Sequence, residues 1–105
     1  MTKQEITQFE IETLELLKEV IDPEIEINIV DLGLIYELYY NGDKNVNIVM
    51  TFSTPACPLG DTINTNIIET IKQKHPDFIT SIDVVFDPLW STAMVSEEGK
   101  RILGL

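Results

Sequence analysis

The chain has 105 residues, of which 44% are hydrophobic, so it can form one domain around a modest core. Its formal net charge of −11 argues against nucleic acid and anionic membranes as partners, because both would repel it. One cysteine excludes an internal disulfide, no apolar run is long enough to span a membrane, and the acidic start does not resemble a signal peptide. We therefore expect a cytoplasmic protein with a single domain over residues 1–105.

The first predicted element is an amphipathic helix. Thr2 and Glu5 fit a capping box, and apolar residues recur at helical spacing over residues 6–21. Asp22-Pro23 is expected to end this helix, because the residue before a proline is pushed out of the helical conformation. An acidic loop over residues 23–33 follows. It contains three alternating isoleucines that suggest a short strand: Ile25, Ile27 and Ile29.

The middle of the chain predicts a hairpin followed by a crossover unit. Strands are expected over residues 34–40 and 46–52, joined by the turn Asn41-Gly42-Asp43. A helix over residues 59–74 and a strand over residues 82–86 come next. Since strand–helix–strand connections are right-handed crossovers, the second and third strands should run parallel.

The last predicted element is a short helix that begins at Ser96 and stops at Gly104. The element order is therefore α-β-β-α-β-α. We expect an α+β fold, a compact sandwich in which a small mixed three-stranded sheet is covered by helices on one face.

The cysteine lies in a short motif between the second strand and the second helix. Cys57 stands between two prolines, in the segment from Ser53 to Asp61. Free amides and the positive dipole end of the following helix favour thiolate, the form that binds metal or attacks electrophiles. The alternative is a cysteine that acts as a small buried hydrophobe.

Neither a thiol enzyme nor a complete metal site is favoured by the residue types present. The single histidine, His75, is separated from Cys57 by a helix that would place it about 27 Å away, too far to serve as its base. One cysteine cannot hold an iron–sulfur cluster alone, because such clusters usually take four cysteines. The cysteine could instead hold a metal weakly together with carboxylates, or it could pair with a second copy or a partner protein. The carboxylate of Asp61 either shares a helix face with Cys57 or is simply stabilised in the first turn by the helix dipole.

Other candidate residues lie in two loops. The carboxylates of Asp22, Glu24 and Asp31 act either as loop caps or as functional groups. Trp90 follows Asp87-Pro88 and acts either as a core anchor or as an anchor for a partner.

Five segments occur in an order that resembles a known family: Asp22-Pro23-Glu24, residues 29–36, residues 50–58 around Cys57, residues 86–91 and residues 103–105. Together they resemble the iron–sulfur cluster assembly domain family, which includes SufT, the PaaD-like proteins and the cytosolic cluster-targeting factors of eukaryotes. The resemblance implies the same compact α/β fold.

The resemblance also implies a function. It suggests a non-enzymatic accessory factor that carries or targets iron–sulfur clusters to client apoproteins through a reactive cysteine, Cys57. A transient cluster is expected, and one arrangement for it is a cluster shared between the subunits of a homodimer. The expected partners are an assembly scaffold or client apoproteins. The other motif positions are Asp22, Glu24, Asp31, Thr51, Ser53, Thr54 and Trp90. The PaaD-like branch suggests an alternative, a non-catalytic subunit of a multicomponent oxygenase.

The predicted topology brings these motifs together. Cys57 and Trp90 follow the ends of two parallel strands, and the loop over residues 22–33 enters the antiparallel strand beside them. We therefore expect all three at one edge of the sheet, where ligand and partner sites of open α/β sheets often lie.

Overall fold

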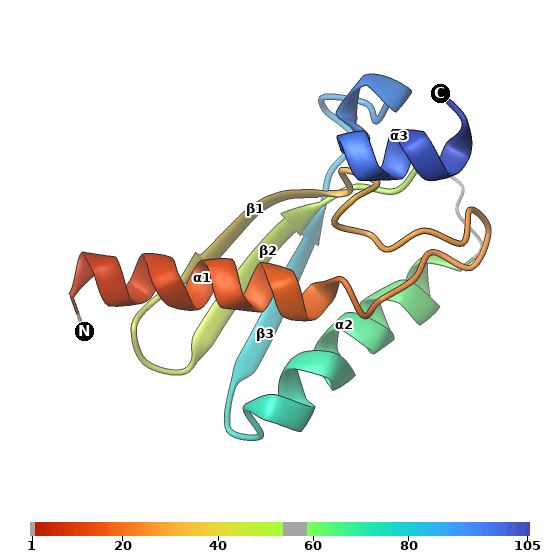
Figure 1. Ribbon diagram of the computed structural model, residues 1–105. Helices are drawn as coiled ribbons and strands as arrows, with labels where there is room; N and C mark the ends of the chain where they lie inside the picture. Colours follow the sequence, from red (N-terminus) through yellow and green to blue (C-terminus); the bar gives the residue numbers. More distant parts are fainter. Residues whose placement is uncertain (1, 54–58) are drawn as a thin grey trace.

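A computed structural model describes residues 2–53 and 59–105 of the chain (Figure 1). Its elements, in chain order, are α1 (Lys3–Leu17), β1 (Ile35–Tyr40), β2 (Asn45–Met50), α2 (Gly60–Lys74), β3 (Ile79–Val84), the 3₁₀ helix η1 (Thr92–Met94) and α3 (Glu97–Leu103). The predicted α+β fold and its element order are confirmed. Among the described residues, none of the helices combines the length and apolar character that crossing a bilayer requires.

The sheet is mixed, with strand order β1-β2-β3. β1 runs antiparallel to β2, while β2 and β3 run parallel and are joined through α2, as the crossover rule predicts. Across the middle of the sheet, Ile48 of β2 is paired with Leu38 of β1 on one side and with Ile82 of β3 on the other.

The core lies between this sheet and two helices. The alternate residues of β2 that point to one side, Val46, Ile48 and Met50, are almost completely buried. α2 buries Ile63, Ile67 and Ile71 in the same cluster, and α1 contributes Leu17. Figure 1 shows α1 and α2 on the same side of the sheet, so within the described residues the opposite face has no such helical cover. α3 lies at the end of the molecule to which β2 and β3 run.

The first helix begins as predicted and ends earlier. Thr2 and Glu5 form the capping box, with each side chain accepting from the other's backbone amide at 3.1–3.2 Å. The expectation that the helix continues to residue 21 is wrong. The amide of Val20 donates to Leu17, three residues back, and the carbonyl of Val20 accepts from Ile29 at 3.0 Å. This bond to the returning loop replaces the next helical turn.

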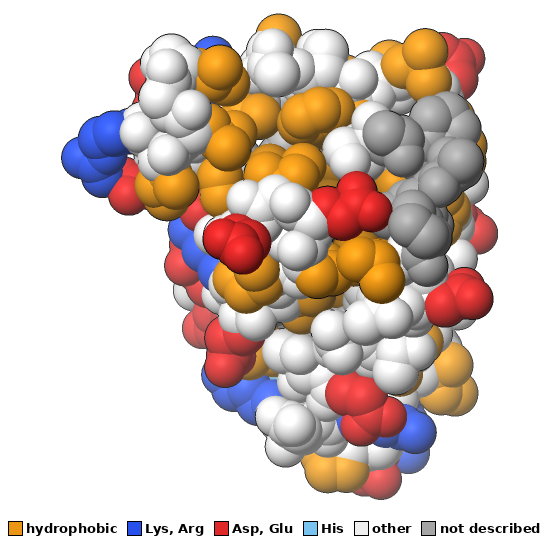
Figure 2. Space-filling view, turned by 90° about the vertical axis from the view of Figure 1, so that its right-hand side faces the viewer, with side chains coloured by type: hydrophobic (Ala, Val, Ile, Leu, Met, Phe, Trp, Pro, Cys, Tyr) orange, Lys and Arg blue, Asp and Glu red, His pale blue; other side chains and the backbone are white. Residues whose placement is uncertain are grey.

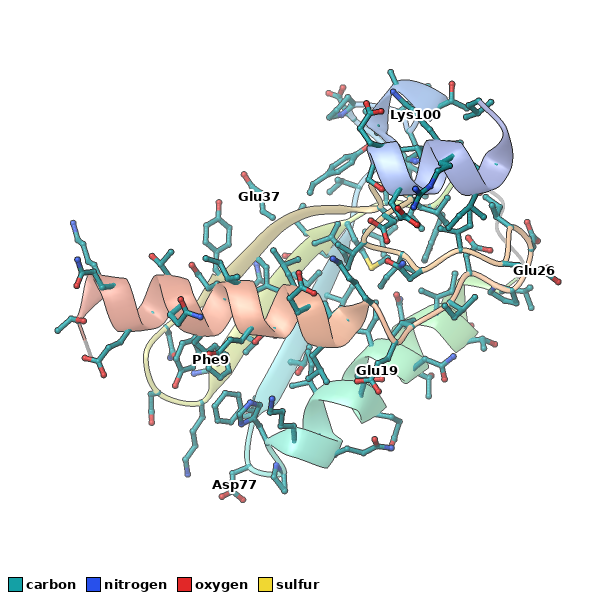
Figure 3. The ribbon with its side chains drawn as sticks, viewed as in Figure 1. Phe9, Glu19, Glu26, Glu37, Asp77 and Lys100 are labelled. Carbon is teal, nitrogen blue, oxygen red and sulfur yellow. The ribbon has the colours of Figure 1, made fainter. Side chains whose placement is uncertain are left out.

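The predicted strand of alternating isoleucines in the 22–33 loop is also wrong. Ile27 and Ile29 are buried, but the loop forms only one isolated bridge, between Ile21 and Asn28. Glu26, at the outer tip of the loop (Figure 3), has a φ of 66° and winds the chain back instead of extending it. The alternation therefore reflects burial against the core and not strand pairing.

The second half follows its local signals closely. β3 begins at Ile79 and not at residue 82, because Ile79 already pairs with Asn45 of β2. It ends at Val84 and not at Phe86, because the last bond between the strands joins the Val85 amide to the Met50 carbonyl. α3 has Ser96 as N-cap, which accepts from the Gly99 amide at 3.0 Å, and Gly104 as a left-handed C-cap.

An aromatic cluster closes the end of the core opposite α3. Phe9 of α1 (Figure 3) packs against Tyr40, Phe78 and the ring of His75, which is the C-cap residue of α2. Burial lowers the pKa of His75 below its ordinary value, so its neutral form is favoured there. This histidine therefore has a packing role at the C-terminus of α2.

Candidate functional site

Loop residues and strand ends meet in the turn Leu32–Leu34, which leads into β1. The indole nitrogen of Trp90 donates to the Leu32 carbonyl at 2.6 Å. The amide of Thr51, just beyond β2, donates to the Leu34 carbonyl at 2.9 Å. Segments that follow the two parallel strands are thus both bonded to the turn Leu32–Leu34, at the sheet edge where the topology predicts them.

Asp31 connects this loop to the last helix. Its two carboxylate oxygens accept from the Ser96 hydroxyl at 2.8 Å and from the Asn28 amide group at 2.6 Å. Its backbone carbonyl accepts from the Ser96 amide at 2.7 Å. The hydrogen bond from Asn28, together with that from Ser96, lowers the pKa of Asp31 below its ordinary value. Asp31 is therefore charged at neutral pH and holds α3 against the loop.

The other two loop carboxylates differ in exposure. Asp22 is only 2% exposed, and one of its carboxylate oxygens accepts from the amides of Glu24 and Ile25 at 2.8 and 3.3 Å. This geometry is that of a side chain that caps its own turn. Glu24 is exposed, so its carboxylate is available to solvent or to a partner.

Residues on both sides of the cysteine motif are described, but Thr54 and Cys57 lie outside the described residues. On the N-terminal side, Thr51 is buried and Ser53 is half-buried. On the C-terminal side, the N-cap residue of α2, Leu59, makes no side-chain capping hydrogen bond, and Asp61 is exposed in the first turn. First-turn amides without a capping side chain favour a negative charge nearby.

A close contact sets where α2 begins. A Cβ atom added to Gly60 would lie 2.9 Å from the ring of Phe52, so this ring packs directly on the first residue of the helix. Only glycine permits so close an approach without displacement of the ring. The contact joins the chain before the motif to the chain after it.

Three residues with structural roles at this site were not predicted from the sequence as site residues. Asn28 and Ser96 bind the Asp31 carboxylate, and the Tyr36 hydroxyl donates to the Pro88 carbonyl at 2.7 Å. Ser96 gives a helix-capping signal, but nothing local in the sequence indicates its partner 65 residues away. Within residues 2–53 and 59–105, the His, Cys, Asp and Glu side chains form no group of three or more able to hold a metal ion.

A Trp90→Phe variant should lose about 1–2 kcal/mol of unfolding free energy, because the Leu32 carbonyl would lose its hydrogen-bond donor. Urea denaturation followed by circular dichroism measures this difference. Tyr39→Phe is the matched control: Tyr39 is 52% exposed, and its replacement should change the free energy by less than about 0.5 kcal/mol. Equal stability of Trp90→Phe and the wild type would show that the indole bond does not anchor the loop.

The surface near this site is partly apolar. Figure 2 views the molecule from the right-hand side of Figure 1, and hydrophobic side chains gather in its upper half, the α3 end. The large hydrophobic side chains exposed in the C-terminal segment are Leu89, Ile102, Leu103 and Leu105. Contiguous exposed apolar surface is typical of regions that contact other molecules.

Comparisons with known proteins agree with this architecture. The model of a family described as iron–sulfur cluster assembly protein matches residues 11–84. An Fe-S protein maturation auxiliary factor from Porphyromonas gingivalis is 36% identical, over 95% of each chain. The Fe-S protein maturation auxiliary factor SufT of Staphylococcus aureus is 33% identical, over 82% of this chain and 98% of its own.

Solved structures show the same fold. A domain of unknown function from Bacillus anthracis superposes with a TM-score of 0.93 at 30% identity, over 99% of each chain. A conserved hypothetical protein from Thermotoga maritima superposes with a TM-score of 0.75 at 32% identity, over 100% of this chain and 96% of its own. Sequence and structure therefore agree that the chain belongs to the iron–sulfur cluster assembly protein family.

Proposed function

We propose that this protein is an accessory factor in iron–sulfur protein maturation, and that it carries or targets clusters to client apoproteins through Cys57. Relatives named as Fe-S protein maturation auxiliary factors support the general role. The observation that carries the proposal is the bonding of Trp90 and Thr51 to the Leu32–Leu34 turn. It brings a residue that follows β2 and a residue that follows β3 to the same turn, and Cys57 comes six residues after Thr51 in the sequence.

The chemistry of the motif follows from its place in the chain. Cys57 stands three residues before the first residue of α2, whose N-cap residue, Leu59, makes no side-chain capping hydrogen bond. A thiolate is favoured close to such a helix start, and thiolate is the form that binds iron. Cys57 is accordingly proposed as the residue that contacts the cluster.

The cluster is cargo in this proposal, and it is shared. A cluster with four thiolate ligands needs more than the one cysteine that a single copy supplies. A second copy, a scaffold or the client supplies the remaining ligands, which makes the complex transient. A thiol enzyme is not favoured, because α2 is 15 residues long and places His75 at its far end, about 22 Å from its first residue.

Anaerobic reconstitution with iron and sulfide tests this proposal. After size-exclusion chromatography, iron measured in each peak should show a weak, oxygen-sensitive cluster in a species larger than the monomer. Cys57→Ala should bind none, whereas His75→Asn, altered at the opposite end of α2, should bind as the wild type does. A monomer peak with a stable, stoichiometric cluster would contradict the shared arrangement.

The alternative role, as a non-catalytic oxygenase subunit, has no observation in its favour. The relatives compared above are named for iron–sulfur maturation. The activity of iron–sulfur client enzymes in cells is therefore the measurement that tests the proposed role.

A further inference from the structure

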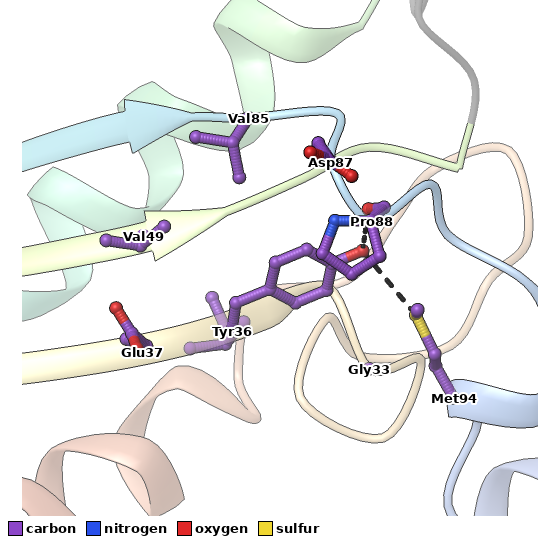
Figure 4. A pocket seen from close by; sticks show the side chains of 9 residues that line it. Gly33, Tyr36, Glu37, Val49, Val85, Asp87, Pro88 and Met94 are labelled. Carbon is purple, nitrogen blue, oxygen red and sulfur yellow. Dashed lines mark hydrogen bonds between the residues drawn. The ribbon is translucent and has the colours of Figure 1, made fainter.

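A groove lies on the face of the sheet opposite α1 and α2. It has a volume of about 590 Å³, and it extends from β1 and β2 to the segment between β3 and η1 (Figure 4). Val49, which lies between the core residues Ile48 and Met50, points to this open face, and Val85 lies beside it on the neighbouring segment. The volume falls within the range of surface sites that hold a ligand or a few side chains.

The apolar wall of the groove is held in place by hydrogen bonds. The hydroxyl of Tyr36, at the start of β1, donates to the Pro88 carbonyl at 2.7 Å and contacts the Met94 sulfur at 3.5 Å. Figure 4 shows these contacts crossing one end of the groove. They join the first strand to the loop after the third, so the concave shape exists before anything binds.

Carboxylates surround the apolar floor. In the sheet register, Val49 is paired with Glu37 of β1 on one side and with Asp83 of β3 on the other, and Asp87 lies at the rim. All three carboxylate residues are exposed. The ion pairs found in the described part of the chain, Lys18–Glu15 and Arg101–Glu98, include none of them.

The lysine and arginine residues all lie elsewhere. None of its seven basic residues is on a strand or lines the groove: Lys3, Lys18, Lys44, Lys72, Lys74, Lys100 and Arg101. The groove therefore combines an apolar floor with uncompensated negative charge. A partner that complements this groove would present an apolar side chain with cationic neighbours.

We propose that this groove docks a segment of the client or scaffold protein in which an apolar side chain is flanked by lysine or arginine. The apolar side chain covers Val49 and Val85, and the cationic groups pair with Glu37, Asp83 or Asp87. A second copy of this chain is a poorer occupant, because two molecules of net charge −11 repel each other. The inference rests on the proposed function in one respect, since a delivery factor must hold its recipient.

The probe for this proposal is a random library of peptides of about 12 residues, selected on the immobilised full-length protein. Selected peptides should combine a large apolar residue with lysine or arginine and should bind more weakly as salt rises. Their dissociation constants are then measured on variants whose fold is verified by circular dichroism.

Two variants on the same face of β2 separate the groove from general charge effects. Val49→Glu places a carboxylate on the groove floor and should weaken peptide binding by at least about tenfold. Asn47→Glu adds the same charge two residues away, outside the groove lining, and should leave binding within about twofold of the wild type. A double variant that combines Glu37→Gln with Asp87→Asn should reduce the salt dependence of peptide binding.

Peptides that lack basic residues, or that bind Val49→Glu and Asn47→Glu equally, would overturn the proposal. Sedimentation showing a wild-type dimer that Val49→Glu dissociates would make a second copy the occupant and would overturn it as well. Peptide binding needs neither iron nor Cys57, so it succeeds or fails separately from the cluster-carrying role.

Discussion

A Cys57→Ser variant is expected to fold normally and to lose activation of iron–sulfur client enzymes in cells. Serine has a similar volume, so the change in unfolding free energy should be within about 1 kcal/mol. A hydroxyl at this position, however, is not deprotonated near neutral pH and does not replace a thiolate as an iron ligand. The measurement is client enzyme activity in a deletion strain that expresses the variant at the wild-type level.

A second measurement examines the thiol itself. Its alkylation rate as a function of pH should show a pKa below that of an unfolded control, because the following helix start favours the thiolate. His75→Asn is the matched control in cells, since it alters the opposite end of α2 and leaves the thiol in place. Full complementation by Cys57→Ser would instead support a purely structural cysteine.

A Gly33→Ala variant should cause the largest loss of stability among these changes, about 3 kcal/mol or more. Gly33 has a φ of 78°, and an added Cβ would lie 2.2 Å from the backbone oxygen of Met94. A backbone atom cannot rotate away as a side chain can, so the turn or η1 must shift. The Trp90 bond to Leu32 and the Tyr36 bond to Pro88 would both be strained by this shift.

Gly104→Ala provides the matched control for this experiment. Gly104 has a φ of 77°, almost the same conformation, but an added Cβ would meet no atom within 4 Å. It should lose only the conformational cost of about 1 kcal/mol. Urea unfolding measures both variants, and the fluorescence of Trp90, the single tryptophan, reports on the region around Gly33. Equal losses of unfolding free energy in the two variants would show that the contact with the Met94 carbonyl does not destabilise Gly33→Ala.

Local signals explain why most elements were predictable. The Thr2–Glu5 capping box, the periodicity of α2 and the turn at residues 41–43 act over a few residues, and each produced the expected structure. The parallel pairing of β2 and β3 followed from the handedness of crossovers, which depends on backbone chirality more than on sequence detail.

The errors occurred where distant contacts overrule local preference. α1 ends at Leu17 because the Val20 carbonyl bonds to Ile29, and the 22–33 loop winds instead of pairing because Glu26 adopts a positive φ. A periodic pattern reports burial, but it does not say whether the buried residues sit on a helix, a strand or a turn.

For function, the sequence by itself determined which chemical groups are present: one thiol before a helix, a strongly acidic surface and a family motif with a single tryptophan. Only the tertiary structure decided their partners. Asp31 bonds to Ser96, which is 65 residues away in the sequence, and Trp90 bonds to Leu32, which is 58 residues away. Tyr36 bonds to Pro88 at one end of the groove, over a separation of 52 residues. Contacts at such separations form because the packed core brings the strand ends together, and no local propensity specifies them.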